Sequence, residues 1–205
     1  MEHSQLNTLY LEHFQFRFDP FDDRKGKFQF FQAKRRTVLE QLVYFARYGR
    51  FVLAVTGPEA AGKTVLRHAL VAAVKDNVQC LVVSGSQTRD AATFLQHMAK
   101  ELGCAQSDSM SVLAAIEQLR AHGRSLYLIV DDAELVSEAV ILLTQRIAQS
   151  GATAKASVFL FGKPSLQTLL QDVAQKAELE HHVIELESWS AVEVQSYLQM
   201  RLEAA

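Results

Sequence analysis

The feature that most constrains how this chain folds is the loop GPEAAGKT at residues 57–64. The loop follows a continuous apolar run at 51–56 (FVLAVT), which is typical of a buried parallel strand, and leads into a helical pattern at 63–75. Loops of the form G-x-x-x-x-G-K-[ST] between a strand and a helix wrap around a phosphate and direct their backbone N–H groups inward. Gly62 permits a backbone conformation that other residues disfavour, and the N-terminus of the following helix adds partial positive charge. The sequence therefore predicts an α/β fold that binds the phosphates of a nucleotide.

The residues of this loop are predicted to have different roles. We expect Lys63 to reach the β- and γ-phosphates and to act in catalysis, and Thr64 to ligate Mg²⁺. The residues predicted to contact the nucleotide are Gly57, Pro58, Glu59, Ala60, Ala61, Gly62, Lys63, Thr64 and Val65. The ligands predicted for the site are therefore a nucleotide and Mg²⁺.

Acidic residues follow a later apolar run at 126–130 (LYLIV). Asp131 stands where a carboxylate holds Mg²⁺ through water in sites of this type, and Asp132 stands where a carboxylate orients or deprotonates the attacking water. Asp132 is one methylene shorter than the glutamate more usual there. It can act as a general base only if its carboxylate still comes within hydrogen-bond distance of the attacking water. Glu134 is a nearby substitute if the turn directs its side chain inward. The alternative is that the two aspartates only form a helix-capping turn.

A third polar position follows the apolar run at 157–161, where the chain reads Gly162-Lys163-Pro164. One hypothesis is that Lys163 touches the γ-phosphate or the attacking water and stabilises charge there. The other is that Lys163 is a surface residue before a helix whose first turn is set by Pro164. The sequence leaves these two hypotheses open.

Strands and helices alternate along the chain, as expected of a parallel sheet covered by helices on both faces. Apolar runs predict strands at 51–56, 79–84, 126–131, 157–161 and 182–186. Apolar residues at helical spacing predict helices at 33–48, 63–75, 90–102, 111–122, 137–149, 165–176 and 190–204. These elements predict a three-layer P-loop NTPase whose parallel sheet has about five strands.

The N-terminal region is rich in phenylalanine and in positive charge. Nine of the twelve phenylalanines precede residue 52. In FQFRFDPF at 14–21 they alternate with other residues, which predicts an extended segment that packs on the main domain through one face. The run RKGKFQFFQAKRR at 24–36 carries six Lys or Arg and no acid. It is either a solvated surface or, with the aromatic rings nearby, a surface for nucleic acid or an anionic membrane.

Composition excludes several other classes of protein. Cys80 and Cys104 are the only cysteines, so no disulfide framework exists and a reducing compartment is expected. The longest apolar runs, such as 126–130, are far shorter than the ~18 residues of a membrane span, and the N-terminus MEHSQL lacks a signal-peptide pattern. We therefore expect a cytoplasmic chain with no membrane span of its own.

Together these segments resemble the ExeA/GspA family of bacterial AAA+-like ATPases, which includes the ATPase-bearing DamX-like proteins. The resemblance covers 16–21, 39–70, 126–136 (LYLIVDDAELV), 158–170 (VFLFGKPSLQTLL) and 185–202. It implies a AAA+ (ASCE-type) fold, ATP or ADP as the nucleotide, and self-association or a protein partner in an envelope complex. It also implies that the chain is the cytoplasmic part of a longer inner-membrane protein that carries a SPOR domain.

The resemblance also implies a division of the chain into three parts. The predicted parts are a Phe-rich N-terminal arm at 1–32, a P-loop nucleotide-binding domain at 33–188 and the start of a truncated helical lid at 189–205.

Three departures from the family pattern concern hydrolysis. Asp132 replaces a glutamate, Lys163 replaces a glutamine, and 175–181 lacks the family's arginine, with Lys176 the nearest cation. An arginine finger contributes about 10³–10⁵ in rate, and lysine cannot reproduce its planar fork. We therefore expect a weak ATPase or a nucleotide-dependent switch in a bacterial cell-envelope, secretion or cell-division assembly. The alternative is a DNA-binding accessory ATPase of the TniB/MuB type that uses the basic run at 24–36.

Overall fold

The computed structural model of the chain describes residues 10–21, 33–48, 51–74, 77–150 and 156–205. Its elements are α2 (Ala33–Tyr48), β1 (Val52–Thr56), α3 (Lys63–Ala72), β2 (Val78–Ser84), α4 (Ala91–Leu102), α5 (Ser109–Ala121), β3 (Ser125–Asp131), η1 (Ala133–Leu135), α6 (Glu138–Gln149), β4 (Ala156–Gly162), α7 (Ser165–Ala177), β5 (His181–Glu185) and α8 (Ala191–Ala204). The chain divides into two compact units, Arg35–Ser188 and Met1–Lys34 with Trp189–Ala205. The larger unit contains the whole sheet.

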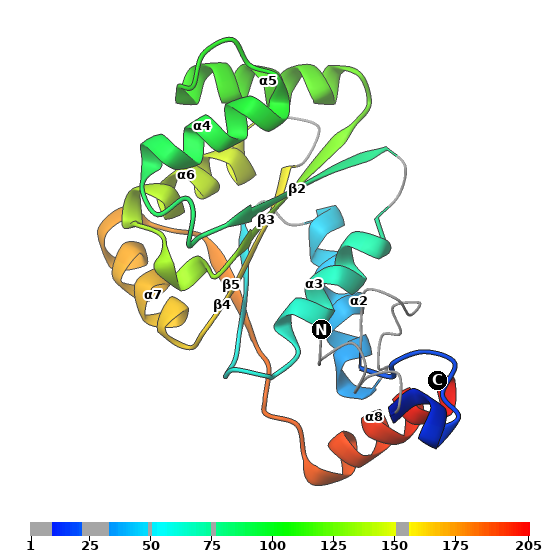
Figure 1. Ribbon diagram of the computed structural model, residues 1–205. Helices are drawn as coiled ribbons and strands as arrows, with labels where there is room; N and C mark the ends of the chain where they lie inside the picture. The colour runs from blue at the N-terminus through cyan, green and yellow to red at the C-terminus, as the bar shows by residue number, and fades with distance from the viewer. Residues whose placement is uncertain (1–9, 22–32, 49–50, 75–76, 151–155) are drawn as a thin grey trace. The chain divides into compact units, whose positions relative to one another are not determined.

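The larger unit is built on a five-stranded parallel sheet in the order β2-β3-β4-β1-β5 (Figure 1). β1 and β4 lie inside the sheet, and every residue of both strands is buried. This burial explains why both strands are continuous apolar runs rather than alternating ones. The predicted α/β P-loop fold, with about five parallel strands and helices on both faces, is confirmed.

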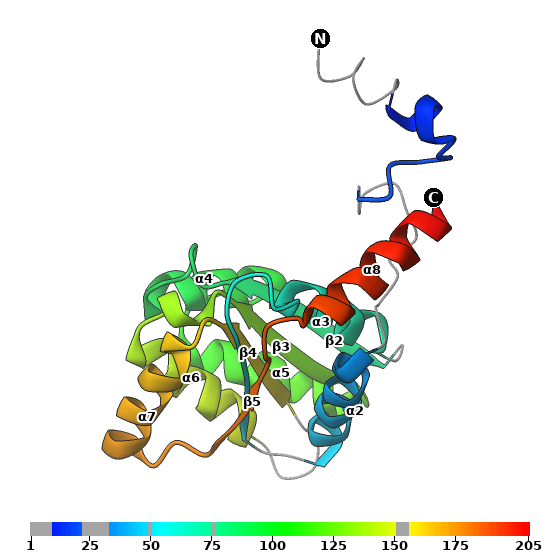
Figure 2. The same cartoon turned by 90° about the horizontal axis from the view of Figure 1, so that it is seen from below.

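Helices cover both faces of this sheet. α2 and α3 lie on one side, and α6 and α7 lie on the other (Figures 1 and 2). On the side of α6 and α7, Phe94 and Met98 of α4 and Ile116 of α5 join the strand side chains in one apolar core. On the side of α2 and α3, the Ser157 hydroxyl of β4 donates a hydrogen bond of 2.8 Å to the Ala46 carbonyl of α2. The sheet is therefore held between two helical layers.

Polar side chains fix where three of the helices begin. Asp90 and Asp108 each accept hydrogen bonds from backbone N–H groups in the first turn of α4 and α5. Ser190 and Glu193 form a reciprocal capping box at the start of α8. These caps satisfy N–H groups that have no partner within their own helix.

The N-terminal arm belongs to the smaller unit, and the structure describes its residues 10–21. Residues 10–14 are helical, Gln15 has a φ of 57°, and turns and bends follow. The predicted extended segment is therefore wrong. The reason is local hydrogen bonding, because the Phe16 N–H donates to the Leu11 carbonyl at 2.9 Å and closes a helix end.

Two further expectations concern membranes and thiols. No helix in the described ranges has both the length and the apolar character needed to cross a membrane. Cys80 and Cys104 are both free thiols. Burial raises the pKa of the Cys80 thiol to about 11, so that it stays protonated at neutral pH.

The core at β4 can be tested with Phe159→Ala. Phe159 has no exposed surface, so the truncation removes apolar contacts and leaves a cavity. We expect the free energy of unfolding to fall by about 3–5 kcal/mol, measured by urea denaturation followed by circular dichroism. Met110→Ala is the control, since Met110 of α5 is 77% exposed, and it should change stability by less than about 0.5 kcal/mol. Equal effects of the two substitutions would contradict the buried position of β4.

Candidate functional site

The loop at 57–64 connects the end of β1 to the start of α3. A Cβ at Gly57 would stand 2.6 Å from the carbonyl oxygen of Leu186, which is too close for any residue other than glycine. Gly62 has a φ of 88° and forms the N-cap of α3 in the left-handed conformation that glycine adopts without strain. The two glycines thus bring the loop backbone to the N–H end of a helix, where unpaired donors are available to an anion.

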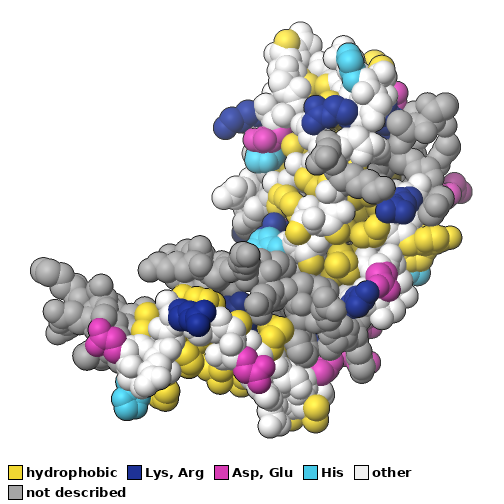
Figure 3. Space-filling model, turned by 90° about the vertical axis from the view of Figure 1, so that its right-hand side faces the viewer, with side chains coloured by type: hydrophobic (Ala, Val, Ile, Leu, Met, Phe, Trp, Pro, Cys, Tyr) yellow, Lys and Arg dark blue, Asp and Glu magenta, His cyan; other side chains and the backbone are white. Residues whose placement is uncertain are grey.

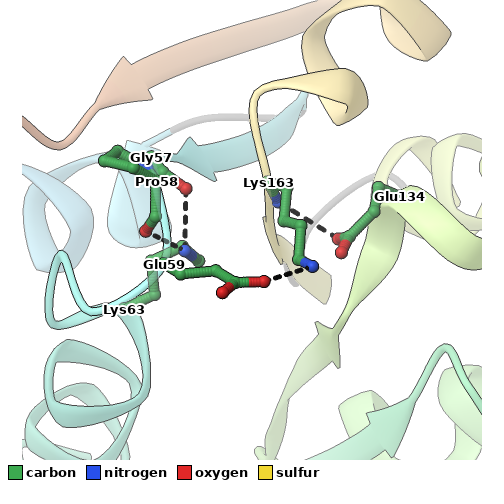
Figure 4. A network of polar contacts seen from close by, with 6 residues as sticks. All are labelled: Gly57, Pro58, Glu59, Lys63, Glu134 and Lys163. Carbon is green, nitrogen blue, oxygen red and sulfur yellow. Dashed lines mark hydrogen bonds and ion pairs between the residues drawn. The ribbon is translucent and has the colours of Figure 1, made fainter.

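Lys63 begins α3, and its ammonium group folds back over the loop (Figure 4). Its Nζ donates hydrogen bonds to the carbonyl oxygens of Gly57 and Pro58, both at 2.7 Å. Burial lowers the pKa of Lys63, while the negative charges of Glu134 and then Asp131 act in the opposite direction. The ammonium is therefore held by two neutral acceptors that phosphate oxygens can replace.

The other loop residues differ in exposure. Ala61 is buried, Pro58, Gly62 and Val65 are partly buried, and Glu59, Ala60 and Thr64 are exposed. The exposed Thr64 lies in the first turn of α3, beside Lys63. Its hydroxyl is accessible for the metal-binding role that the sequence predicts.

Asp131 is the last residue of β3, and its carboxylate pairs with Arg67 of α3. The distance from Arg67 Nε to Asp131 Oδ2 is 3.0 Å, and the two side chains are only 16% and 25% exposed. Sequence reasoning missed Arg67, whose one signal is its place a helical turn after Lys63 on the same helix face. Arg67 thus neutralises the carboxylate that is predicted to act on Mg²⁺.

The oxygen donors of this region suit Mg²⁺. Thr64 supplies a hydroxyl and Asp131 a carboxylate, and Mg²⁺ at phosphate sites binds one or two carboxylates together with oxygens of the substrate. The part of the chain that the structure describes contains no cluster of three or more His, Cys, Asp or Glu that could hold a metal ion. With Thr64 and Asp131 as its protein ligands, Mg²⁺ would complete its coordination with oxygens of the nucleotide and water.

The backbone of Asp132 is held in one conformation, while the residue itself is exposed to solvent. Its φ of 51° is left-handed, and its side chain makes no capping hydrogen bond to η1. The neighbouring strand explains the fixed backbone, since the Gly85 N–H donates to the Asp131 carbonyl at 2.7 Å and a Cβ at Gly85 would collide with the Asp132 carbonyl. The alternative in which the Asp132 side chain caps a helix is therefore wrong.

Glu134 points toward the end of β4. Its Oε2 accepts a hydrogen bond of 3.1 Å from the Lys163 N–H (Figure 4). A Cβ at Gly162 would stand 2.7 Å from the same oxygen, which explains the glycine at this strand end. The sequence named Glu134 as a nearby substitute for Asp132 but could not give its direction.

Lys163 reaches across to the loop. Its Nζ lies 2.6 Å from Oε1 of Glu59, and the two side chains are 50% and 79% exposed (Figure 4). The hydrogen bond to Glu59 raises the pKa of Lys163, and the same bond lowers the pKa of Glu59. Exposed ion pairs contribute little to stability, so this contact can be exchanged at small cost.

Arg35 is a second residue whose role sequence reasoning missed. It lies in the basic run at 24–36, yet its side chain is only 4% exposed. One guanidinium nitrogen donates to the carbonyls of Ala61 at 3.2 Å and of Glu187 at 2.8 Å. Arg35 therefore binds the backbone of the loop from a buried position. It is not part of a surface for nucleic acid or membrane.

Only the end of the basic run at 24–36 lies within the described residues. Residues 24–32 of the run lie outside the described ranges. On the face shown in Figure 3, the coloured Lys and Arg side chains stand apart from one another. Lys176, the cation that the sequence places in the segment 175–181, pairs with Glu138 of α6 at 2.7 Å.

A parallel sheet with a glycine-rich loop after β1 and an acidic strand end at β3 defines the class of P-loop NTPases. Residues 46–170 match the family described as "AAA domain" (AAA_22), and the chain belongs to this family. The predicted AAA+ P-loop domain is thereby confirmed. A search of curated protein sequences gives no match.

Several solved structures share the fold. The Cdc6 protein of Pyrobaculum aerophilum has a TM-score of 0.65 and 20% identity, covering 90% of this chain and 53% of its own. The ORC2 protein of Aeropyrum pernix, solved as ADPNP–ADP complexes, has a TM-score of 0.61 and 16% identity, covering 85% and 51%. The ORC1 protein of Aeropyrum pernix in complex with DNA has a TM-score of 0.61 and 11% identity, covering 90% and 52%. This chain thus spans about half the length of these proteins, and the likeness concerns the fold alone.

The support that Arg35 gives the loop can be tested with Arg35→Ala. The substitution leaves two carbonyls without their charged donor, so we expect a loss of about 3 kcal/mol in the free energy of unfolding. Arg36→Ala is a matched control on the same helix, because Arg36 pairs with Glu40 at 63% exposure. It should cost less than about 1 kcal/mol by urea denaturation, and a cost similar to that of Arg35→Ala would contradict the buried role of Arg35.

Proposed function

We propose that this chain binds Mg²⁺–ATP at residues 57–65 and acts as a weak ATPase or a nucleotide-dependent switch. In this proposal the loop backbone surrounds the phosphates and Lys63 binds the β- and γ-phosphates. Thr64 holds Mg²⁺ directly and Asp131 holds it through water. Asp132 or another carboxylate after β3 activates water, and Lys163 binds at the γ-phosphate.

The observation that carries this proposal is the meeting of three strand ends at one edge of the sheet. β4 lies between β1 and β3, so the loop after β1, the acidic end of β3 and Lys163 after β4 all leave the same edge. Ligands of open parallel sheets bind outside the carboxyl ends of the strands. The nucleotide in the ORC2 protein of Aeropyrum pernix, which has a similar fold, further supports ATP as the ligand.

Weak hydrolysis is supported by the positions of two residues. Asp132 is exposed, and Lys176 pairs with Glu138 instead of being available in place of an arginine finger. A switch is supported by the contact between Lys163 and Glu59. The γ-phosphate of ATP would compete with Glu59 for Lys163, whereas ADP lacks that group. ATP and ADP would thus leave two loops of the site in different arrangements.

The biological setting in this proposal comes from the resemblance to the ExeA/GspA family. We place the chain in a bacterial cell-envelope, secretion or cell-division assembly, as the cytoplasmic part of a longer inner-membrane protein. Its partner would be a second copy or another protein of that assembly.

Nucleotide binding can be tested with Lys63→Ala. The substitution removes the ammonium that would bind two phosphates, and charged hydrogen bonds of this kind contribute about 1.5–3 kcal/mol each. We therefore expect ATP affinity, measured by isothermal titration calorimetry with Mg²⁺, to fall at least about 100-fold. Lys100→Ala, at an exposed position in α4, should leave affinity unchanged. The proposal fails if the unaltered chain binds no ATP, or if both variants bind it equally well.

DNA binding is the second candidate function, and the DNA complex of the ORC1 protein of Aeropyrum pernix favours testing it. If the basic run at 24–36 binds phosphates, the logarithm of DNA affinity should fall linearly with the logarithm of salt concentration. Replacing Arg24, Lys25 and Lys27 together by Gln should then weaken binding and reduce that slope, measured by fluorescence anisotropy. Absence of DNA binding at low salt, or an unchanged slope, would exclude this use of the run.

A further inference from the structure

The turn after β3 sends two carboxylates in different directions. Asp132 has a left-handed backbone and an exposed side chain. The Leu135 N–H then donates to the Asp132 carbonyl at 3.0 Å, which closes the short 3₁₀ helix η1. Because a 3₁₀ helix has about three residues per turn, Asp132 and Glu134 do not share one face of η1, and Glu134 faces the end of β4.

Glu134 is held in place by one of its two oxygens. Oε2 accepts the hydrogen bond from the Lys163 N–H at 3.1 Å, beside the space that Gly162 leaves open. Within the described ranges, Oε1 has no hydrogen-bond partner. The carboxylate is therefore positioned through Oε2, and Oε1 remains able to accept a proton.

Glu134 also lies within the electrostatic field of the phosphate-binding loop. Burial lowers the pKa of Lys63, and Glu134 opposes this shift more than Asp131 or Glu59 does. Lys63 is the residue proposed to bind the γ-phosphate. Among the carboxylates that act on the Lys63 ammonium, Glu134 therefore has the strongest effect.

We propose that Glu134, and not Asp132, is the catalytic carboxylate that accepts a proton from the attacking water in ATP hydrolysis. This inference rests on the proposed function, because it requires ATP at the loop. It deepens that function by naming the general base among the carboxylates that follow β3.

The proposed step balances with water and ATP alone. The water oxygen forms a bond to the γ-phosphorus, while the bond from that phosphorus to the β–γ bridging oxygen breaks. A water proton passes to Oε1 of Glu134, ADP and inorganic phosphate leave, and Glu134 then releases the proton to solvent. Oε2 keeps its hydrogen bond to the Lys163 N–H throughout, so the base remains oriented.

A purely structural role for Glu134 would need only an acceptor for the Lys163 N–H. Glu134→Gln keeps an acceptor of the same length but cannot take up a proton, so it separates the two roles. Asp132→Asn is the matched control, because it removes the same charge two residues away and asparagine tolerates the left-handed conformation.

The experiment compares the full chain with its Glu134→Gln and Asp132→Asn variants. ATP affinity is measured by calorimetry with Mg²⁺, and hydrolysis is measured as a single turnover of radiolabelled ATP with the chain in excess. We expect Glu134→Gln to bind ATP as tightly as the unaltered chain or more tightly, since a negative charge near the phosphates is removed. Its hydrolysis rate should fall about 10²-fold or more, so that the bound nucleotide stays ATP. Asp132→Asn should keep ATP affinity and should lose much less of the hydrolysis rate than Glu134→Gln does.

Each other outcome contradicts a stated claim. Wild-type hydrolysis by Glu134→Gln, or an equal loss in Asp132→Asn, overturns the role of Glu134. A chain that binds ATP without hydrolysing it also overturns that role and leaves ATP binding standing. A chain that binds no ATP overturns the proposed function itself. If Glu134→Gln does not fold by circular dichroism, Glu134→Asp, which withdraws the charge by one methylene, should show the same loss of rate with ATP binding kept.

Discussion

The parallel pairing of β1 with β4 is the constraint on which the candidate site depends. Thr56 lies opposite Gly162, so the loop after β1 and the segment after β4 leave the sheet side by side. β3 pairs with the other edge of β4 and brings Asp131 to the same end of the sheet. The contact between Lys163 and Glu59 joins residues that are far apart in the chain, and it exists because of this register.

The charged groups of the site already have partners within the protein. Lys63 is bound by two loop carbonyls, Asp131 by Arg67, and Lys163 by Glu59. Binding of Mg²⁺–ATP in the proposed way would exchange these partners, so affinity would be a difference between two sets of polar contacts. This exchange of partners suits a switch, because ATP would replace more of these polar contacts than ADP would.

Predictions that depended on local pattern succeeded where the fold supplied the expected surroundings. The apolar runs that became β1 and β4 are buried on both faces. The alternating segment at 14–21 was predicted to be extended, yet it forms a helix end and turns. A period of two predicts a strand only if another strand provides hydrogen bonds, and here the Phe16 N–H donates to the Leu11 carbonyl of the preceding helix instead.

The sequence by itself determined the loop at 57–64, the glycine that allows its shape and the acidic end of β3, because these features depend on neighbours in the chain. Only the tertiary structure decided which distant groups would meet them. It brought Arg35 into a hydrogen bond with the loop carbonyl of Ala61 and Arg67 into an ion pair with Asp131. It also brought Glu134 to the end of β4. The physical reason is that a side chain's partners across a sheet follow from strand order and register, and local spacing does not encode either.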